Sequence, residues 1–176
     1  MKLAAVPGVT PVSLTSPEQT AEELAALMVR ARGPESAHDP GLRQSAVEAA
    51  ELAHANGAGL VAVVEHAAAD PAVLVALVVV SDVPHGAGAA AELRDYLEAA
   101  AGPDIQDVTE ARTERGHPVV IADRIPAGEP GCQLQAIVIE PEGRRMAVFT
   151  LHSTTGRGWL ELASTLGRLV SSVSFA

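Results

Sequence analysis

The segment from His85 to Ala91 has the spacing of a cofactor-binding motif, after a predicted strand and at the entry to a predicted helix. Gly86, Gly88 and Ala91 match the pattern G-x-G-x-x-A, in which glycines let the backbone approach a pyrophosphate held at a helix N-terminus. Residues 81–85, however, separate the expected strand from the first glycine, and Asp107 is a poor ribose ligand because it begins a strand. We therefore interpret this segment as a flexible loop that enters a helix, and we expect no cofactor.

Histidine, serine and cysteine residues form no recognisable catalytic or metal-binding pattern. The six histidines include no H-E-x-x-H motif, and Glu65 and His66 would point to opposite faces of a strand. His152 and Ser153 are neighbours in a strand, so they cannot pair as base and nucleophile. Cys132 is the only cysteine, which excludes an internal disulfide and a zinc site of several thiolates. We interpret it as a structural thiol, and predict neither catalytic residues nor a metal site.

Charge is distributed unevenly along the chain. Residues 1–110 carry 5 basic and 16 acidic side chains, whereas residues 111–176 carry 7 and 6. The basic residues of the second part are all arginines, and arginine and tryptophan are frequent anchors of protein interfaces. We therefore predict a partner-binding surface that comprises Arg112, Arg115, Arg144, Arg145, Arg157 and Trp159. The alternative is ordinary solvated charge, with Trp159 in the buried stripe of its helix.

Composition limits the class of protein. A chain of 176 residues with 48% hydrophobic side chains can bury one core, so we expect a single domain over residues 1–176. A net charge of −10 disfavours nucleic acid and anionic membranes as partners. The longest apolar run, 72–80, is too short to cross a bilayer, which takes about 20 residues. Pro7 interrupts the N-terminus before a signal peptide can form, so we expect a cytoplasmic protein with no membrane insertion.

The first half of the sequence contains two helix signals and two buried strands. Ser16 and Asp39 each precede a proline, which predicts helices that begin at Pro17 and Pro40 and end at Gly33 and Asn56. Residues 60–64 and 72–80 are apolar throughout, so both faces of these strands should be covered by helices. Their short connection favours antiparallel pairing. Segments 2–6 and 9–14 predict two short strands or an extended arm.

The second half begins with a helix and continues as strands. Residues 92–101 predict a helix with Leu93, Tyr96, Leu97 and Ala100 on one apolar side. Four strands then follow as an antiparallel meander, at residues 106–113, 119–125, 133–140 and 145–152. A last amphipathic helix starts near Trp159, capped by Thr154 or Thr155, and should pack across the meander. The predicted fold is therefore α+β, an antiparallel sheet sandwiched between helices.

The C-terminal part resembles the PsbP-like superfamily of α/β/α sandwiches. The resemblance is carried by the meander, the stretch 148–156, and a helix that ends in Leu169-Val170-Ser171-Ser172-Val173-Ser174-Phe175. The superfamily includes the photosystem II extrinsic subunit PsbP, a Ran-binding transport factor, and small actinobacterial lipoproteins and cytoplasmic relatives. The resemblance implies a binding platform without a shared set of catalytic residues.

Two functions are consistent with these observations. The first is a non-catalytic protein-binding or adaptor domain, which would hold a protein partner or a second copy of itself. The second is a small-molecule-binding protein or enzyme with a pocket near the loop 86–91. The absence of catalytic motifs and the arginine surface favour the first.

Overall fold

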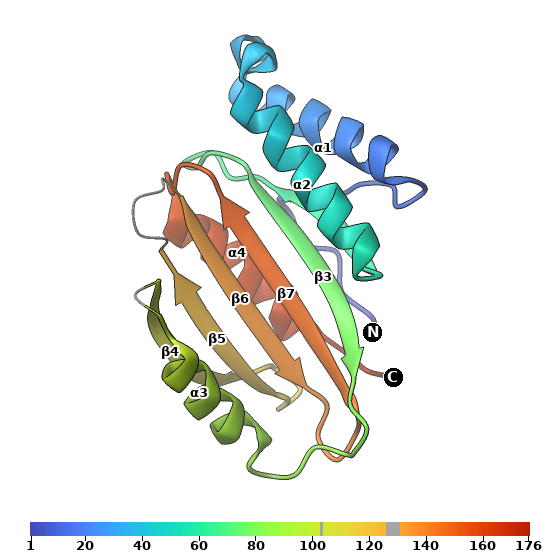
Figure 1. The fold of residues 1–176 in the computed structure, drawn as a ribbon, viewed down its shortest axis with the longest axis vertical. Coiled ribbons are helices and arrows are strands. Elements are labelled where there is room, and N and C mark those ends of the chain that lie inside the picture. Colours follow the sequence, from blue (N-terminus) through green and yellow to red (C-terminus); the bar gives the residue numbers. More distant parts are fainter. Residues whose placement is uncertain (103, 126–130) are drawn as a thin grey trace.

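The central feature of the molecule is a seven-stranded antiparallel sheet with helices on both faces. The computed structural model describes residues 1–102, 104–125 and 131–176. Within them the strand order is β1-β2-β3-β7-β6-β5-β4, and four α-helices pack against the sheet (Figure 1). The predicted α+β class and the layered arrangement are confirmed.

The strands follow the predicted segments closely. Their bounds are β1 Val9–Pro11, β2 Leu60–Val64, β3 Ala72–Val80, β4 Ile105–Arg112, β5 Pro118–Arg124, β6 Cys132–Ile139 and β7 Arg145–Ser153. β2 and β3 pair antiparallel, and β4 to β7 form the expected meander. The N-terminal prediction was only partly right. Val9–Pro11 is a strand, but at residues 2–6 only an isolated bridge from Lys2 to Ser174 forms.

One face of the sheet is closed by helix α4, Trp159–Ser171. Alternate residues of β6 and β7, among them Val138, Phe149 and Leu151, are fully buried against Leu162 and Leu166 of this helix. The predicted threonine cap of α4 is wrong. The helix begins after Gly158, whose φ of 71° brings the chain so close to Ala69 that a Cβ atom at this position would lie 2.3 Å from the Ala69 Cβ.

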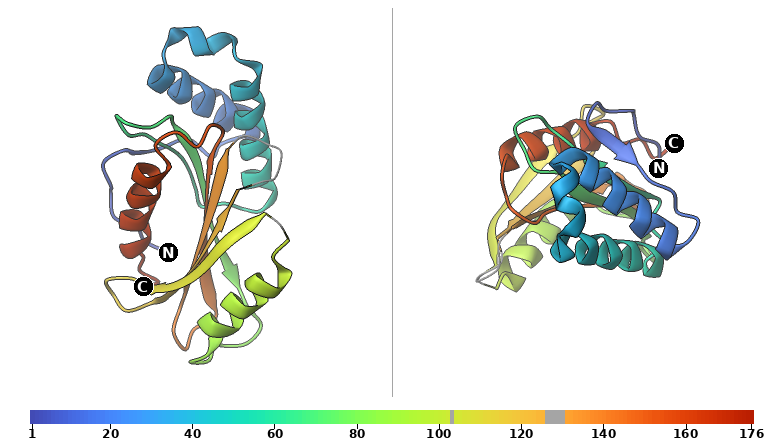
Figure 2. Two further views of the ribbon diagram at one scale, coloured as in Figure 1. Left: turned by 90° about the vertical axis from the view of Figure 1, so that its left-hand side faces the viewer. Right: turned by 90° about the horizontal axis from the view of Figure 1, so that it is seen from above.

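The opposite face carries a helical hairpin. Helix α1, Pro17–Arg32, and helix α2, Pro40–Ala55, lie over β2 and β3 (Figures 1 and 2). The predicted caps are present, since Ser16 Oγ accepts a hydrogen bond from the Gln19 amide at 3.1 Å and Asp39 Oδ1 accepts one from the Gly41 amide at 2.9 Å. Both helices end where their glycine or asparagine signal predicted.

Helix α3, Ala89–Ala100, lies on the same face as α2 but at the other side of the sheet, over β4 and β5. It begins earlier than predicted, and none of its residues is fully buried. Tyr96 was expected on the apolar side, but it is 68% exposed. The apolar stripe of α3 is therefore short, and this helix covers only the edge of the sheet.

The end of β3 differs from the prediction that residues 72–80 are buried. Ala72 to Ala76 are buried, but the exposed fraction rises to 37% at Val78, 39% at Val79 and 66% at Val80. β3 extends beyond the helical hairpin, which leaves Val79 uncovered on that face (Figure 1). Val78 and Val80 point to the opposite face, where α4 packs mainly on β6 and β7.

A candidate binding groove on the bare centre of the sheet

The first half of β6 and the part of β7 that pairs with it are covered on one face only, whereas Ile137 and Ile139, farther along β6, are buried on the second face as well. α4 packs across the first face, whereas on the second face α2 reaches β3 and α3 reaches β4 and β5 (Figures 1 and 2). Between α2 and α3 part of the middle of the sheet remains bare. An antiparallel sheet can leave a whole face open to solvent, but here helices cover both sides of the second face and leave only part of its centre open, so we examine this opening as a candidate site.

A groove of about 420 Å³ lies in this opening. Helix α2 bounds the groove along one side, and β3, β7 and β6 form its floor. Its volume is in the range of pockets that bind small ligands, about 300 to 1,000 Å³. The lining residues are Ser45, Glu48, Ala49, Leu52 and Asn56 of α2, Val73, Val75 and Leu77 of β3, Val148, Thr150 and His152 of β7, and Gln133 and Gln135 of β6.

Polar side chains occupy the part of the floor that is farthest from α2. Gln133 lies opposite His152, and Gln135 lies opposite Thr150, in the pairing of β6 with β7. Directly opposite residues have Cβ atoms about 4.5 to 5.5 Å apart and share one face, so the four side chains form a compact polar array. All four are half-buried.

Three of the four side chains of the array remain available for a ligand. The side chains of Gln133, Gln135 and Thr150 have no hydrogen-bond partner in the part of the chain that the structure describes. Each glutamine amide offers two donors and one acceptor oxygen, and the threonine hydroxyl offers both functions. The groove floor therefore presents several unused donors and acceptors in one small area.

The side of the groove next to α2 contains an aliphatic wall, formed by Val73, Val75 and Leu77 of β3 with Leu52 of α2, although α2 also contributes Ser45, Glu48 and Asn56. Val73 and Val75 are buried at the foot of the helix, and Leu77 continues the same row along β3. Leu52 of α2 stands at the rim with 59% of its surface exposed. An aliphatic wall beside a polar floor suits a ligand that has both kinds of surface.

The strands and α2 give the groove its direction. α2 runs alongside β3, with Ser45 near the start of that strand and Asn56 near its middle, because Gly59 donates a backbone hydrogen bond to Ala76 at 3.0 Å. Along the floor, Val148 to His152 span four residue steps, about 14 Å at roughly 3.4 Å per residue. The groove is therefore elongated along the strands.

The structure divides the predicted arginine surface between two ends of the sheet. Arg112, Arg115, Arg144 and Arg145 lie at the end where β7 begins, whereas Arg157 and Trp159 follow the other end of β7. Eight residue steps from Arg145 to Ser153 correspond to about 27 Å. The six residues therefore do not form one continuous patch, and their role in partner binding stays a prediction.

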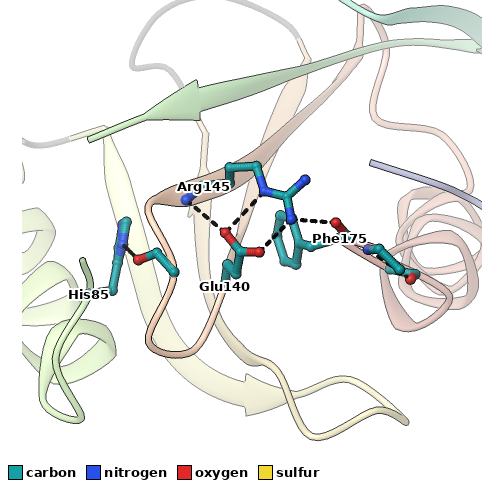
Figure 3. Close-up of polar contacts among 7 residues, drawn as sticks. His85, Glu140, Arg145 and Phe175 are labelled. Carbon is teal, nitrogen blue, oxygen red and sulfur yellow. Dashed lines mark hydrogen bonds and ion pairs between the residues drawn. The ribbon is translucent and has the colours of Figure 1, made fainter. Parts of the chain in front are cut away.

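Arg145 is engaged within the molecule. Its Nε donates to Glu140 Oε2 at 3.0 Å, its Nη2 donates to the Phe175 carbonyl, and its guanidinium lies 5.3 Å from the centre of the Phe175 ring (Figure 3). The ion pair lowers the pKa of the Glu140 carboxyl to about 2. In the same region the His85 amide donates to the Gly143 carbonyl at 2.7 Å. These contacts hold the C-terminal segment and the loop before α3 against the β6–β7 turn.

Arg157 and Trp159 also have partners at their end of the sheet. Arg157 donates to Asp70 at 2.7 Å, and this contact, with a hydrogen bond from Thr155, lowers the pKa of Asp70. Burial raises the pKa of Asp123, against a smaller opposing effect of its hydrogen bond with Trp159. Trp159 is half-buried against the core beneath α4. Both side chains therefore connect elements of the fold.

The remaining candidates take no part in the groove. Burial and the charge of Asp123 raise the pKa of the Cys132 thiol, which disfavours the thiolate that a nucleophile needs. The segment 86–91 forms the entry to α3 and lines neither the groove nor the shallower hollow of about 220 Å³ beside Leu160. In the described residues no three His, Cys, Asp or Glu side chains gather as a metal site would require.

The polar array was missed in the sequence, although a signal for it exists. Gln133 and Gln135 alternate with Leu134 and Ala136, just as Thr150 and His152 alternate with neighbouring apolar residues. This period of two means that one face of each strand is polar over this stretch. The signal becomes a site only when the register places the two polar faces side by side, which the sequence alone does not state.

Comparisons with known proteins leave the site to be interpreted from its own chemistry. No protein-family model matches the chain, and no curated protein matches it significantly. Among the described residues, none of the helices combines the length and the apolar character needed to cross a bilayer.

Proposed function

We propose that this protein is a non-catalytic binding domain that holds its ligand in the groove beside α2. The observation that supports it is the bare centre of the sheet, where Gln133, Gln135 and Thr150 carry unused hydrogen-bonding groups next to an aliphatic wall. A convergent set of polar groups in a mostly apolar hollow is the usual form of a ligand site.

The types of side chain favour binding over catalysis. Amides, a hydroxyl and aliphatic groups form hydrogen bonds and packing contacts, but they neither take up nor release a proton near neutral pH. His152 on the floor and Glu48 on the rim are the lining residues of acidic or basic type, and they stand at different sides of the groove. The lining therefore does not bring an acid and a base together at one reacting atom.

Two finer proposals accompany the first. We propose that the partner is a protein and that the domain works in the cytoplasm, consistent with its charge and composition. The PsbP-like resemblance of the C-terminal part also stays a proposal, supported by an antiparallel meander that α4 crosses, with the C-terminal segment after it.

A fragment screen on the isotopically labelled protein tests the proposal. The probes are small neutral amides, amines, carboxylates and sugars, and the readout is the change in backbone amide NMR shifts. We expect the binding fragments to perturb residues around Gln135, Thr150 and Val75. Shifts confined to the arginines at the end of the sheet, or no shifts with any fragment, would overturn it.

A filled groove provides the matched control. Thr150→Phe places a ring between β6 and β3 on the bare face, whereas Thr109→Phe places the same ring on the exposed edge strand β4. We expect fragment shifts to be lost in the first variant and kept in the second. Equal binding by the two variants would contradict the assignment of the groove.

A further inference from the structure

We infer that the ligand of the groove is an extended peptide segment of a protein partner, with aliphatic side chains at alternate positions and a net positive charge. The inference rests on the proposed function and deepens it. Four features carry it: the shape of the groove, the spacing of the two glutamines, the aliphatic wall and the charge around the opening.

The shape favours a linear ligand over a compact one. The groove follows the strands for about 14 Å, which is the length of about four extended residues. α2 closes it along one side only, because α3 does not contribute to its lining. The long side opposite α2 is therefore open, and a segment of a larger protein can reach the groove from there.

The two glutamines have the spacing of a peptide backbone. Gln133 and Gln135 are two residues apart on β6, so their Cα atoms are separated by roughly 7 Å. A ligand in extended conformation that lies along β6 presents equivalent backbone groups at the same interval. Each amide can accept from a ligand N–H group and donate to a ligand carbonyl, so the pair can bind main chain independently of its sequence.

The aliphatic wall would select side chains. In an extended ligand, successive side chains point to opposite sides, so every second residue would face one way. Val73, Val75 and Leu77 also repeat every second residue along β3, and Leu52 stands above them on α2. Alternate Val, Ile or Leu residues of the ligand would pack here, while the residues between them would face solvent.

Charge around the opening favours a basic segment. The two helices that flank the bare strands carry five acidic and two basic side chains, Glu48, Glu51, Glu92, Asp95 and Glu98 against Arg43 and Arg94. Arg124 stands opposite Gln133 on β5 and reduces this excess without removing it. With a net charge of −10 for the whole chain, acidic peptides and a second copy of this protein would be repelled at long range.

Selection from a random library tests the inference. Phage-displayed heptapeptides are selected on the immobilised full chain, and the most enriched sequence is made as an acetylated, amidated peptide for calorimetry. We expect enrichment of peptides with alternate aliphatic residues and Lys or Arg between them. We also expect affinity to fall at least fivefold when the Lys and Arg residues of the peptide are replaced by Glu.

Two further arms test how the peptide is recognised. Methylation of alternate backbone nitrogens in the peptide should weaken its binding to the unmodified protein at least tenfold, a test that does not depend on the folding of any variant. Gln133→Leu and Gln135→Leu should each weaken binding by about twofold to tenfold, the range of one lost hydrogen bond. Gln19→Leu, on the exposed surface of α1, serves as the control and should leave affinity unchanged.

The outcomes separate this inference from the proposed function. If fragments bind in the groove but no peptide family is enriched, or if neither backbone methylation nor the glutamine variants weaken binding, the peptide inference is wrong and the groove remains a ligand site. Enriched peptides that bind elsewhere also overturn the inference. If neither fragments nor peptides bind in the groove, both proposals fail together.

Discussion

The two faces of strands β6 and β7 show how one pair of strands can serve two purposes. On the face beneath α4, these strands present Leu134, Ala136, Val138, Phe149 and Leu151, which pack into the larger core. On the other face the same strands present Gln133, Gln135, Thr150 and His152 to a groove. The backbone is shared, so the difference lies entirely in the side chains and in what covers them.

The comparison suggests why no helix covers the second face. A glutamine or threonine without a hydrogen-bond partner can stay half-buried because water reaches it, but complete burial would cost about 1 to 3 kcal/mol for each group. A helix across the array would add these costs, whereas α4 on the first face adds only apolar contacts. Polarity of the floor and openness of the groove are therefore consistent with each other.

The largest expected effect is in the closed face. Phe149 has no exposed surface, and Phe149→Ala should lower the free energy of unfolding by about 3 to 5 kcal/mol, because it removes a large buried ring and leaves a cavity. Urea unfolding followed by circular dichroism measures this loss. A loss below about 1 kcal/mol would show that α4 does not pack on the sheet as described.

A smaller effect is expected where the C-terminal segment joins the closed face. Glu140 holds Arg145, which in turn binds the Phe175 carbonyl (Figure 3). The pKa of Glu140 is lowered from 4.5 to about 2 in the folded protein, so ionised Glu140 stabilises the fold above pH 4.5. This contribution decreases as the pH falls from about 4.5 towards 2. Glu140→Gln should therefore lower the urea midpoint at pH 7. Near pH 2 the variant and the unmodified protein should have nearly the same urea midpoint.

Glu142→Gln is the control for this prediction. Glu142 is exposed in the same turn, and the described residues give it no ion pair. Glu142→Gln should leave the urea midpoint unchanged at both pH values. If the effect of Glu140→Gln stays constant between pH 7 and 2, the ion pair is not its cause, and the C-terminal segment is held in another way.

The sequence predicted most of the fold because the decisive signals are local. Ser16-Pro17 and Asp39-Pro40 mark helix starts through capping chemistry, and the alternating residues of the meander mark strands. Exposure was harder to predict. Val78 to Val80 and Tyr96 are as apolar as core residues, and only the lengths and positions of neighbouring helices decide whether they are covered.

The site was not predictable in the same way. β7 separates two groups of the predicted surface, and this separation follows from topology. The first group is Arg112, Arg115, Arg144 and Arg145, and the second is Arg157 and Trp159. Gln133 meets His152, and Gln135 meets Thr150, because of the register of β6 with β7. Strand register depends on turns and on the packing of the whole sheet, so a motif within one segment could not reveal this array.

The smallest expected effect is on the open face, and it tests the comparison most directly. Thr150→Val removes a half-buried hydroxyl that has no partner in the described residues, so the free energy of unfolding should stay within about 0.5 kcal/mol of the unmodified protein. The reverse exchange on the closed face, Val138→Thr, buries a hydroxyl at a position with no exposed surface and should cost about 1 to 3 kcal/mol. Urea unfolding measures both. Equal losses would mean that the two faces are equally covered, which would remove the structural basis of the groove.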